Sequence, residues 1–124
     1  DIRGAFELFA SVTTAVTSVG SWNPASSQVR DVMPPADLRR AEELGCVADI
    51  SGILMRADGE PVDPEFQERC VSISLADFQA VPRVIAVAGG AEKVTAIKAV
   101  TCQDLVTELV TDHHLAKALL GAAQ

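Results

Sequence analysis

One stretch of the sequence, PRVIAVAGGAEK at residues 82–93, constrains the fold more than any other. Its uninterrupted apolar run over 84–88 has the length of a strand and is typical of a strand buried on both faces of a parallel sheet. Gly89 and Gly90 follow, and they allow backbone angles and a close approach of the backbone to a ligand that a β-carbon would prevent. Apolar residues then recur at helical spacing, which predicts a helix over 91–100. The order of strand, glycine turn and helix indicates an α/β protein.

The start of this predicted helix is a candidate anion site. The unpaired N–H groups of a first helical turn would point back over Gly89, Gly90 and Ala91, and with the helix dipole they favour a phosphate or carboxylate. Lys93 lies in the same turn, where a lysine is otherwise slightly unfavourable, and it can add a positive charge. The third glycine of a dinucleotide fingerprint and the lysine ending of a P-loop are both absent, so a nucleotide is not the first ligand to expect. A plain tight turn remains the alternative interpretation.

Composition narrows the class of protein. The chain has 124 residues, of which 48% are hydrophobic, so it can supply the core of one domain or of part of one. Its net charge of −7 argues against contact with a nucleic-acid backbone, which requires clustered Lys and Arg. No apolar run approaches the ~20 residues that span a bilayer, and no signal segment is present, so we expect a soluble protein. Because the sequence begins at Asp1 and already has a helical pattern there, we expect a fragment of a longer chain.

The cysteines and histidines do not indicate a metal site. Cys46, Cys70 and Cys102 are widely separated and form no Cys-x-x-Cys pair. We expect reduced, buried thiols, with Cys46 and Cys70 acting as small hydrophobic residues in or beside strand-like runs. His113 and His114 are adjacent at a predicted helix start, so about 100° of rotation separates them and they cannot easily share a ligand. A surface or capping role is favoured for both, and we expect neither a metal nor a cofactor.

The rest of the chain alternates between helical and strand-like patterns. Helices are predicted at the first residues, over 36–44, from 74 to the break at 82, over 91–100 and after 112. Strands are predicted over 11–19, 46–55, 69–73, 84–88 and 105–110. Such alternation favours an α/β fold with a mainly parallel sheet.

Two further segments are candidate parts of a ligand site. Loops that leave the carboxyl ends of parallel strands build the ligand crevice of an open α/β sheet, so residues 20–23, predicted as a loop, are a candidate wall. Trp22 could cover one face of a ligand or pack beneath this loop. Asp49 lies inside the apolar run 46–55, where a buried carboxylate must be paired, hydrogen-bonded or exposed to a pocket. An internal cap or salt bridge and a binding role are both open for Asp49.

Several motifs, in their order and spacing, resemble the sugar-binding effector domain of SorC-type bacterial transcriptional regulators, often grouped with DeoR-type repressors. They are VADISG at 47–52, ADGEPV at 57–62, SISLADF at 72–78, IAVAGGAEK at 85–93 and LVTD at 109–112. The resemblance covers most of the chain. It breaks down at 53–56, where the family commonly has an arginine, two aromatic residues and an acid, so the identity of the sugar is not indicated.

The resemblance implies a Rossmann-like layered fold, similar to sugar-phosphate isomerases and CoA transferases, that binds a phosphorylated sugar in the cytoplasm. The sugar would control DNA binding by a separate N-terminal helix-turn-helix domain outside this chain. Because domains of this family are about twice as long, residues 1–124 would form the C-terminal part of the effector-binding domain. By position, Lys93 and the amides of the glycine turn would hold the phosphate, and Asp49 would accept hydrogen bonds from sugar hydroxyls. The expected ligand-binding residues are Gly20, Ser21, Asp49, Gly89, Gly90, Ala91 and Lys93.

Three functions are compatible with these residues. We expect a sensing domain without catalytic activity, in which a sugar phosphate shifts the populations of assemblies with different DNA affinity. An incomplete sheet would expose an edge and an apolar face, so we also expect a homo-oligomer, either a dimer or a tetramer. An isomerase-like enzyme is the alternative, with Asp49 as general base and Lys93 stabilising an oxyanion, although no second well-placed acid or histidine is evident. An assembly module with a degenerate pocket is the third possibility.

Overall fold

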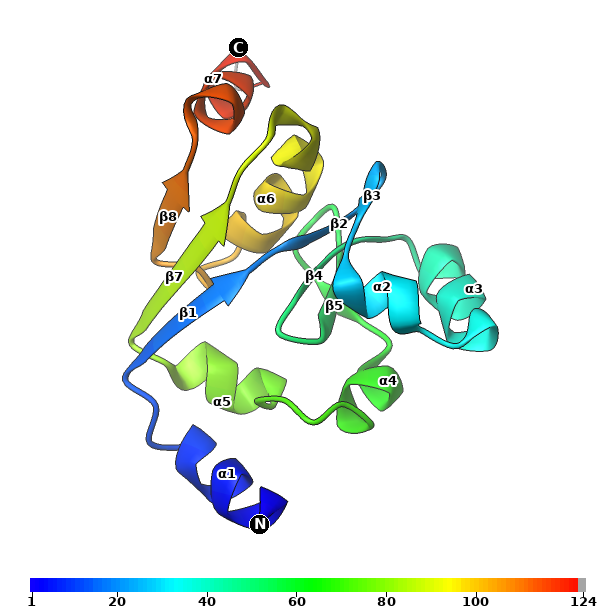
Figure 1. Cartoon of the computed structure of the whole chain (residues 1–124), viewed down its shortest axis with the longest axis vertical. Helices are drawn as coiled ribbons and strands as arrows, with labels where there is room; N and C mark the ends of the chain where they lie inside the picture. The colour runs from blue at the N-terminus through cyan, green and yellow to red at the C-terminus, as the bar shows by residue number, and fades with distance from the viewer. Residues whose placement is uncertain (123–124) are drawn as a thin grey trace.

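The computed structural model describes residues 1–122 and contains two β-sheets that are joined through Val19 (Figure 1). The helices are α1 (Ile2–Phe9), α2 (Gln28–Val32), α3 (Pro35–Glu43), α4 (Pro64–Glu68), α5 (Leu75–Ala80), α6 (Val94–Thr101) and α7 (His113–Ala122), with a 3₁₀ turn η1 (Ala91–Lys93) before α6. The strands are β1 (Thr14–Ser18), β2 (Gly20–Trp22), β3 (Ala25–Ser26), β4 (Cys46–Ile50), β5 (Ile53–Arg56), β6 (Pro61–Val62), β7 (Arg83–Ala88) and β8 (Glu108–Thr111). The expected α/β class with a parallel sheet is confirmed.

The parallel sheet has the strand order β1-β7-β8. Its central strand β7 matches the strand predicted over 84–88, and it pairs in parallel with both neighbours. Val84, Ala86 and Ala88 point into the core, whereas the alternate positions of β7 are more exposed. The expectation that this strand is buried on both faces is therefore wrong for this chain, because helices cover only one face of the sheet.

An antiparallel sheet with the order β3-β2-β4-β5-β6 was not predicted. Residues 20–23, expected as a loop, largely form β2, which continues from β1 into the second sheet. The run 46–55, expected as one strand, is a hairpin of β4 and β5 that turns at Ser51 and Gly52. These two residues have φ angles of 51° and 80°, and positive φ at both central positions is characteristic of a type I′ hairpin turn. Apolar residues on both sides of the turn concealed it in the sequence.

Four shorter segments also differ from the sequence-based expectation. Residues 69–73, predicted as a strand, form an irregular connection in which the Gln67 side chain donates to the Ile73 carbonyl at 2.9 Å. Two helices, α2 and α4, occur where none was predicted, and the side chains of Ser27 and Asp63 cap their N-termini. The last strand begins at Glu108 rather than at 105. Local capping bonds thus determine short helices that lack a long apolar period.

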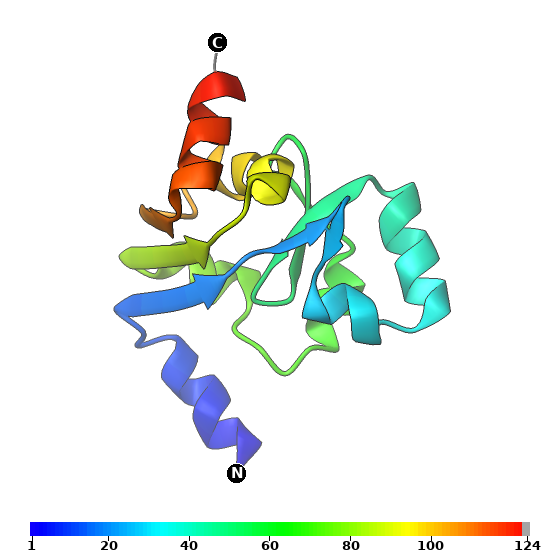
Figure 2. The same ribbon diagram turned by 45° about the horizontal axis from the view of Figure 1, so that its top comes forward.

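Two clusters of buried side chains pack on opposite sides of the antiparallel sheet. The larger one includes Ile50, Phe78 and Ile97 and joins both sheets to α5, α6 and α7. The smaller one includes Trp22 and Phe66 and lies beneath α2, α3 and α4. In Figure 2, α3 and α6 lie on opposite sides of β4 and β5. The antiparallel sheet is therefore a middle layer between helices.

The far face of the parallel sheet is open. Val16, Val87 and Val110 point out of it and are 68%, 45% and 54% exposed.

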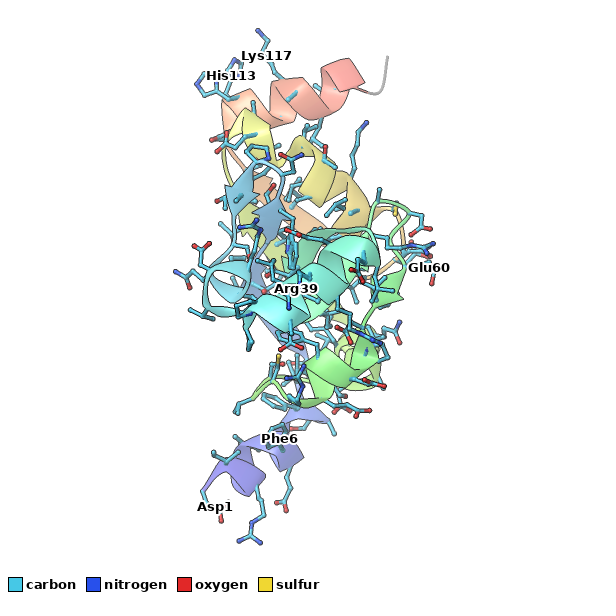
Figure 3. All side chains as sticks on the ribbon, turned by 90° about the vertical axis from the view of Figure 1, so that its right-hand side faces the viewer. Asp1, Phe6, Arg39, Glu60, His113 and Lys117 are labelled. Atoms are coloured by element: carbon cyan, nitrogen blue, oxygen red, sulfur yellow. The ribbon has the colours of Figure 1, made fainter. Side chains whose placement is uncertain are left out.

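Helix α1 buries none of its residues, and Phe6 on α1 lies at the opposite end of the molecule from Lys117 on α7 (Figure 3). No helix in residues 1–122 has both the length and the apolar character that a membrane span requires.

The three thiols are free and differ in exposure. Cys46 is buried in β4, and burial raises the pKa of its thiol to about 12. Cys70 is half-buried in the irregular segment after α4, and Cys102 at the end of α6 is exposed, so the expectation of burial holds only for Cys46. His113 and His114 are exposed at the start of α7. Within the described part of the chain, no three His, Cys, Asp or Glu side chains gather as they would around a metal ion.

Candidate functional site

A cavity of about 470 Å³ opens where the chain passes from the parallel to the antiparallel sheet. Its walls come from the end of β1, the segment from β2 to α2, the β4–β5 turn and the end of η1. The lining residues are Thr17, Ser18, Val19, Gly20, Ser26, Ser27, Gln28, Val29, Asp31, Asp49, Ser51, Gly52 and Lys93. This volume lies within the range of roughly 300–1,000 Å³ that is usual for small-molecule sites.

Asp49 is the buried acid of this cavity. It belongs to β4, is 5% exposed, and accepts hydrogen bonds at Oδ2 from Trp22 Nε1 at 3.0 Å and from Ser27 Oγ at 2.5 Å. Burial raises the pKa of the carboxyl group, and the Ser27 and Trp22 hydrogen bonds and the charge of Lys93 oppose this effect. Two side-chain hydrogen bonds therefore satisfy this carboxylate, in place of the internal cap or salt bridge that the sequence left open, and the binding role stays a prediction. Neither bond uses Oδ1, so the carboxylate can still accept from a ligand.

Gly20 permits the close approach of this carboxylate to the backbone. It pairs with Asp49 across β2 and β4, and a β-carbon added to Gly20 would overlap the Asp49 side chain. The requirement for glycine here is steric, because its φ angle is not in the left-handed region. Gly20 thus forms part of the cavity wall and leaves the space beside β2 that the Asp49 side chain occupies.

Trp22 and Ser27 connect Asp49 to helix α2. Trp22 is 6% exposed and packs beneath α2, with the Arg30 guanidinium 5.9 Å from the centre of its ring. It therefore packs below the segment, which is one of the two roles that the sequence left open. Ser27 Oγ donates to Asp49 and accepts the Arg30 N–H at 3.0 Å as the cap of α2. These bonds attach the cavity wall formed by α2 to the middle of the antiparallel sheet.

Lys93 supplies a positive charge to the cavity. It is the last residue of η1, and its Nζ donates a hydrogen bond of 2.7 Å to the carbonyl of Val19, the residue that joins the two sheets. An ammonium group has three N–H donors, so this bond leaves capacity for a ligand anion. Among the described residues that line the cavity, Lys93 is the only Lys or Arg.

The glycine turn lies outside the cavity lining. Gly90 has a φ of 95°, which favours glycine, and its N–H donates to Asp112 Oδ2 at 2.8 Å. The other oxygen of Asp112 accepts the Leu115 N–H at 2.8 Å and caps α7. The amide expected to hold a phosphate is therefore bonded to a carboxylate, and Gly89 and Ala91 are likewise not part of the lining. Whether a ligand contacts this turn stays a prediction.

The structure thus brings Gly20, Asp49 and Lys93 together from three distant segments. Ser21 is fully buried next to them, its hydroxyl has no hydrogen-bond partner among the described residues, and it does not line the cavity. The sequence reasoning missed Asp31, a second acid of the cavity. The sequence feature that could have indicated this acid is Ser27, the N-cap of the helix that carries Asp31. Ser27 lay in a stretch interpreted as a loop.

Comparison with known proteins places this chain in a family. A family profile described as "Putative sugar-binding domain" matches residues 1–121. The central glycolytic genes regulator of Bacillus subtilis is 39% identical over 87 residues, covering 70% of this chain and 25% of the regulator. The transcriptional regulator LsrR of an Enterobacter species is 32% identical over 130 residues, covering 98% of this chain and 39% of LsrR.

Solved structures show the same fold. A transcriptional regulator from Streptococcus pneumoniae superimposes with a TM-score of 0.85 at 27% identity, covering 98% of this chain and 47% of the other. The sugar-binding domain of a DeoR regulator from Pseudomonas syringae gives 0.72 at 27%, covering 95% and 43%. Full-length SorC from Klebsiella pneumoniae gives 0.83 at 21%, covering 96% and 39%. The chain spans less than half the length of each of these relatives, which are described as regulators or as domains of regulators. It belongs to the family of sugar-binding domains of SorC- and DeoR-type transcriptional regulators.

Proposed function

We propose that this chain is the effector-sensing part of a bacterial transcriptional regulator and that a phosphorylated sugar occupies the cavity at the junction of the two sheets. The observation that carries the proposal is the convergence of Lys93 and Asp49 in one cavity of about 470 Å³. Five residues with hydroxyl side chains line the same cavity, which gives it the polar character that a sugar requires.

The two charged groups suit different parts of such a ligand. The Lys93 ammonium would contact the phosphate, because its charge and remaining N–H donors match an anion. Asp49 would accept hydrogen bonds from sugar hydroxyls at Oδ1, since Trp22 and Ser27 both bond to Oδ2. Gly20 would allow the sugar to approach the backbone of β2 beside this carboxylate. The expected residues outside the cavity lining would then pack against its walls, unless the glycine turn opens to accept the phosphate. They are Gly89, Gly90, Ala91 and Ser21.

DNA binding would belong to a separate helix-turn-helix domain outside these residues. The net charge of −7 makes this chain a poor partner for DNA, and the relatives described above are more than twice its length. The effector would shift the populations of a homo-oligomer, either a dimer or a tetramer, between states of different DNA affinity. We place this activity in the cytoplasm, where DNA and sugar phosphates meet.

The test is thermal unfolding of the intact protein with phosphorylated sugars and with the matching free sugars. A ligand at ~100 times its dissociation constant stabilises the folded state by about 2.7 kcal/mol, which corresponds to several degrees. We expect a shift with phosphorylated sugars only, and we expect Lys93→Ala to abolish it. Lys117→Ala is the matched control, because Lys117 is an exposed lysine on α7 at the far end of the molecule (Figure 3).

Two results would contradict the proposal. The first is a failure of every phosphorylated sugar, and of inorganic phosphate at high concentration, to stabilise the intact protein. The second is an equal loss of the shift in the Lys93 and Lys117 variants, which would show that the charge near the cavity is irrelevant.

A further inference from the structure

We infer that Ser51 helps to select the ligand of this cavity by accepting a hydrogen bond from one hydroxyl group of the sugar, and that Thr17 positions the Ser51 hydroxyl for this bond. The inference rests on the proposed function, because it concerns the same cavity. It adds two residues that are not among the ligand-binding residues expected from the sequence. It also states what kind of group the ligand presents to them.

Thr17 and Ser51 form a bridge between the two sheets in the cavity wall. Thr17 lies near the end of β1 in the parallel sheet, Ser51 lies in the turn between β4 and β5, and their hydroxyl oxygens are 3.0 Å apart. Both residues are half-buried, and both line the cavity. They also line a mainly apolar groove of about 340 Å³ that includes Phe9 and Phe78. The two hydroxyl groups therefore mark the boundary between the polar cavity and the apolar groove.

The hydrogen bonds of Thr17 determine which of the two hydroxyls donates. Thr17 Oγ1 also lies 3.2 Å from the Ser18 carbonyl oxygen, which can only accept. A hydroxyl has one proton, so Thr17 makes both bonds only by donating to the Ser18 carbonyl and accepting from Ser51. The Ser51 proton is then used, and the lone pairs of its oxygen remain. Ser51 Oγ is thus an acceptor, which a ligand hydroxyl can satisfy and a fully ionised phosphate cannot.

The backbone at Ser51 gives a second argument. Its φ of 51° lies in the left-handed region, where glycine, asparagine and aspartate are the usual residues of such a turn. Residues held in sparsely populated backbone conformations cluster at ligand sites, where the surrounding structure maintains them. A glycine here would relieve the strain but would carry no hydroxyl. The turn itself therefore gives no reason for serine, whereas a hydroxyl directed by Thr17 does.

The neighbouring acid offers the same kind of group. Asp49 precedes Ser51 by two residues on the same hairpin, and the bonds from Trp22 and Ser27 leave its Oδ1 able to accept. The hairpin of β4 and β5 thus presents two acceptors to the cavity, and Lys93 presents the cation. We expect the ligand to direct its phosphate toward Lys93 and its hydroxyl groups toward this hairpin.

The experiment measures the coupling between Ser51 and a ligand hydroxyl in the intact protein. Isothermal titration calorimetry uses glucose 6-phosphate, fructose 6-phosphate and ribose 5-phosphate, each with the analogues that lack one hydroxyl group, and inorganic phosphate as a probe without a sugar. At one position of the sugar that binds, we expect loss of the hydroxyl to weaken binding about fivefold in the unmodified protein, as for one neutral hydrogen bond. The same loss should have no effect in Ser51→Ala.

Further variants separate the role of the hydroxyl from an effect on folding. Ser51→Gly should unfold at about the same temperature as the unmodified protein, because glycine tolerates the left-handed backbone, and it should still lose the fivefold discrimination. Thr17→Val keeps the shape of the side chain without its hydroxyl and should reduce the discrimination, whereas Thr17→Ser should retain it. Ser11→Ala is the matched control, because Ser11 is an exposed serine that donates to a carbonyl and does not line the cavity.

The possible outcomes separate this inference from the proposed function. If a sugar phosphate binds and Ser51→Ala discriminates at every hydroxyl position as the unmodified protein does, the inference is overturned while the proposed function stands. Binding of inorganic phosphate alone would also overturn it, because the hydroxyl acceptor would have no role. Unchanged discrimination in Thr17→Val would remove the positioning role of Thr17. Failure of inorganic phosphate and of every sugar phosphate to bind would contradict the proposed function itself, and the inference with it.

Discussion

At the scale of single residues, the approach of the Gly20 backbone to the Asp49 carboxylate has a direct consequence for stability. Gly20→Ala places a methyl group where the carboxylate lies, so Asp49 must move or the strands must separate. We expect a loss of about 1–3 kcal/mol in the free energy of unfolding, as for other overpacked sites. Urea denaturation measures it. Because Trp22 donates to Asp49, its fluorescence should also change.

Gly4→Ala is the matched control for this substitution. A β-carbon at Gly4 in α1 would have no neighbour within 4 Å, and alanine has the higher helix propensity. We expect no destabilisation in this variant. A Gly20→Ala protein as stable as the Gly4→Ala protein would show that the contact of Gly20 with Asp49 is not restrictive.

The raised pKa of Asp49 predicts a specific dependence of stability on pH. Because burial raises this pKa in the folded state, ionisation of Asp49 reduces stability as the pH rises from the ordinary value of 3.8 through the folded value. Asp49→Asn cannot ionise, and its amide oxygen can accept both existing hydrogen bonds. We therefore expect the stability of the variant relative to the unmodified protein to increase over this pH interval and then stay constant, by about 1.4 kcal/mol per unit of pKa shift.

Urea denaturation at a series of pH values from 4 to 8 measures this difference. Acids whose pKa is lowered, such as Asp37 and Asp58, give the opposite dependence, but they are present in both proteins and cancel. If the stability of Asp49→Asn relative to the unmodified protein falls with rising pH, the fold stabilises Asp49 as a carboxylate. Burial would then not be the dominant effect on its pKa.

At the scale of elements, Asp112 holds the glycine turn against the start of α7. Asp112→Ala removes both the bond to the Gly90 amide and the cap at Leu115. Ser74→Ala removes the cap at the Asp77 amide of α5 without affecting a second segment. We expect a larger fall in the urea midpoint for Asp112→Ala than for Ser74→Ala. Equal midpoints would show that the Gly90 bond adds nothing to the cap.

The predictability of each element follows from how local its determinants are. The strand β7, the turn at Gly90 and helices α3, α5 and α6 have apolar periods or glycine and proline signals in their own sequence, and all were predicted. The switch from β1 to β2 depends on pairing of Gly20 with Asp49, which lies much later in the chain. No local pattern indicates such a pairing, so this segment was interpreted as a loop.

The candidate site shows the same limit. Asp49 and Lys93 were identified because an acid in an apolar run and a lysine at a helix start are unusual in themselves. Their meeting in one cavity was implied by the family resemblance and requires the tertiary structure to be seen. The Gly90 amide was expected to be free for a phosphate, but Asp112, placed by the next strand of the sheet, bonds to it. Asp31 was missed because α2, the helix that carries it, has only five residues, and its two apolar residues, Val29 and Val32, are too few to form a helical period.

At the scale of the whole molecule, the open face of the parallel sheet affects the behaviour of this chain in isolation. Val87 and Val110 are paired neighbours on that face and are largely exposed. Contiguous apolar surface of this kind promotes association. We expect the isolated chain to sediment above its mass of 13.0 kDa in analytical ultracentrifugation, with the sedimentation coefficient rising with concentration.

Substitution of the face tests the cause of this association. Val87→Thr with Val110→Thr keeps the β-branched shape and should shift the distribution toward the monomer. Val71→Thr, at an exposed valine in the irregular segment after α4, should not. A well-folded monomer at all concentrations would contradict the prediction that this surface promotes self-association of the chain.

The pairing of β1 with β7 also determines the order in which the chain can fold. Thr14 lies opposite Arg83, and the complete antiparallel sheet is inserted between them in the sequence. Closing so long a loop costs more conformational entropy than closing the β4–β5 hairpin, whose strands meet across Ser51 and Gly52. Long-range pairings of this kind slow folding. The hairpin is therefore expected to acquire protection from hydrogen exchange early in refolding, and the cavity, which needs both sheets, to exist only after the last and slowest step.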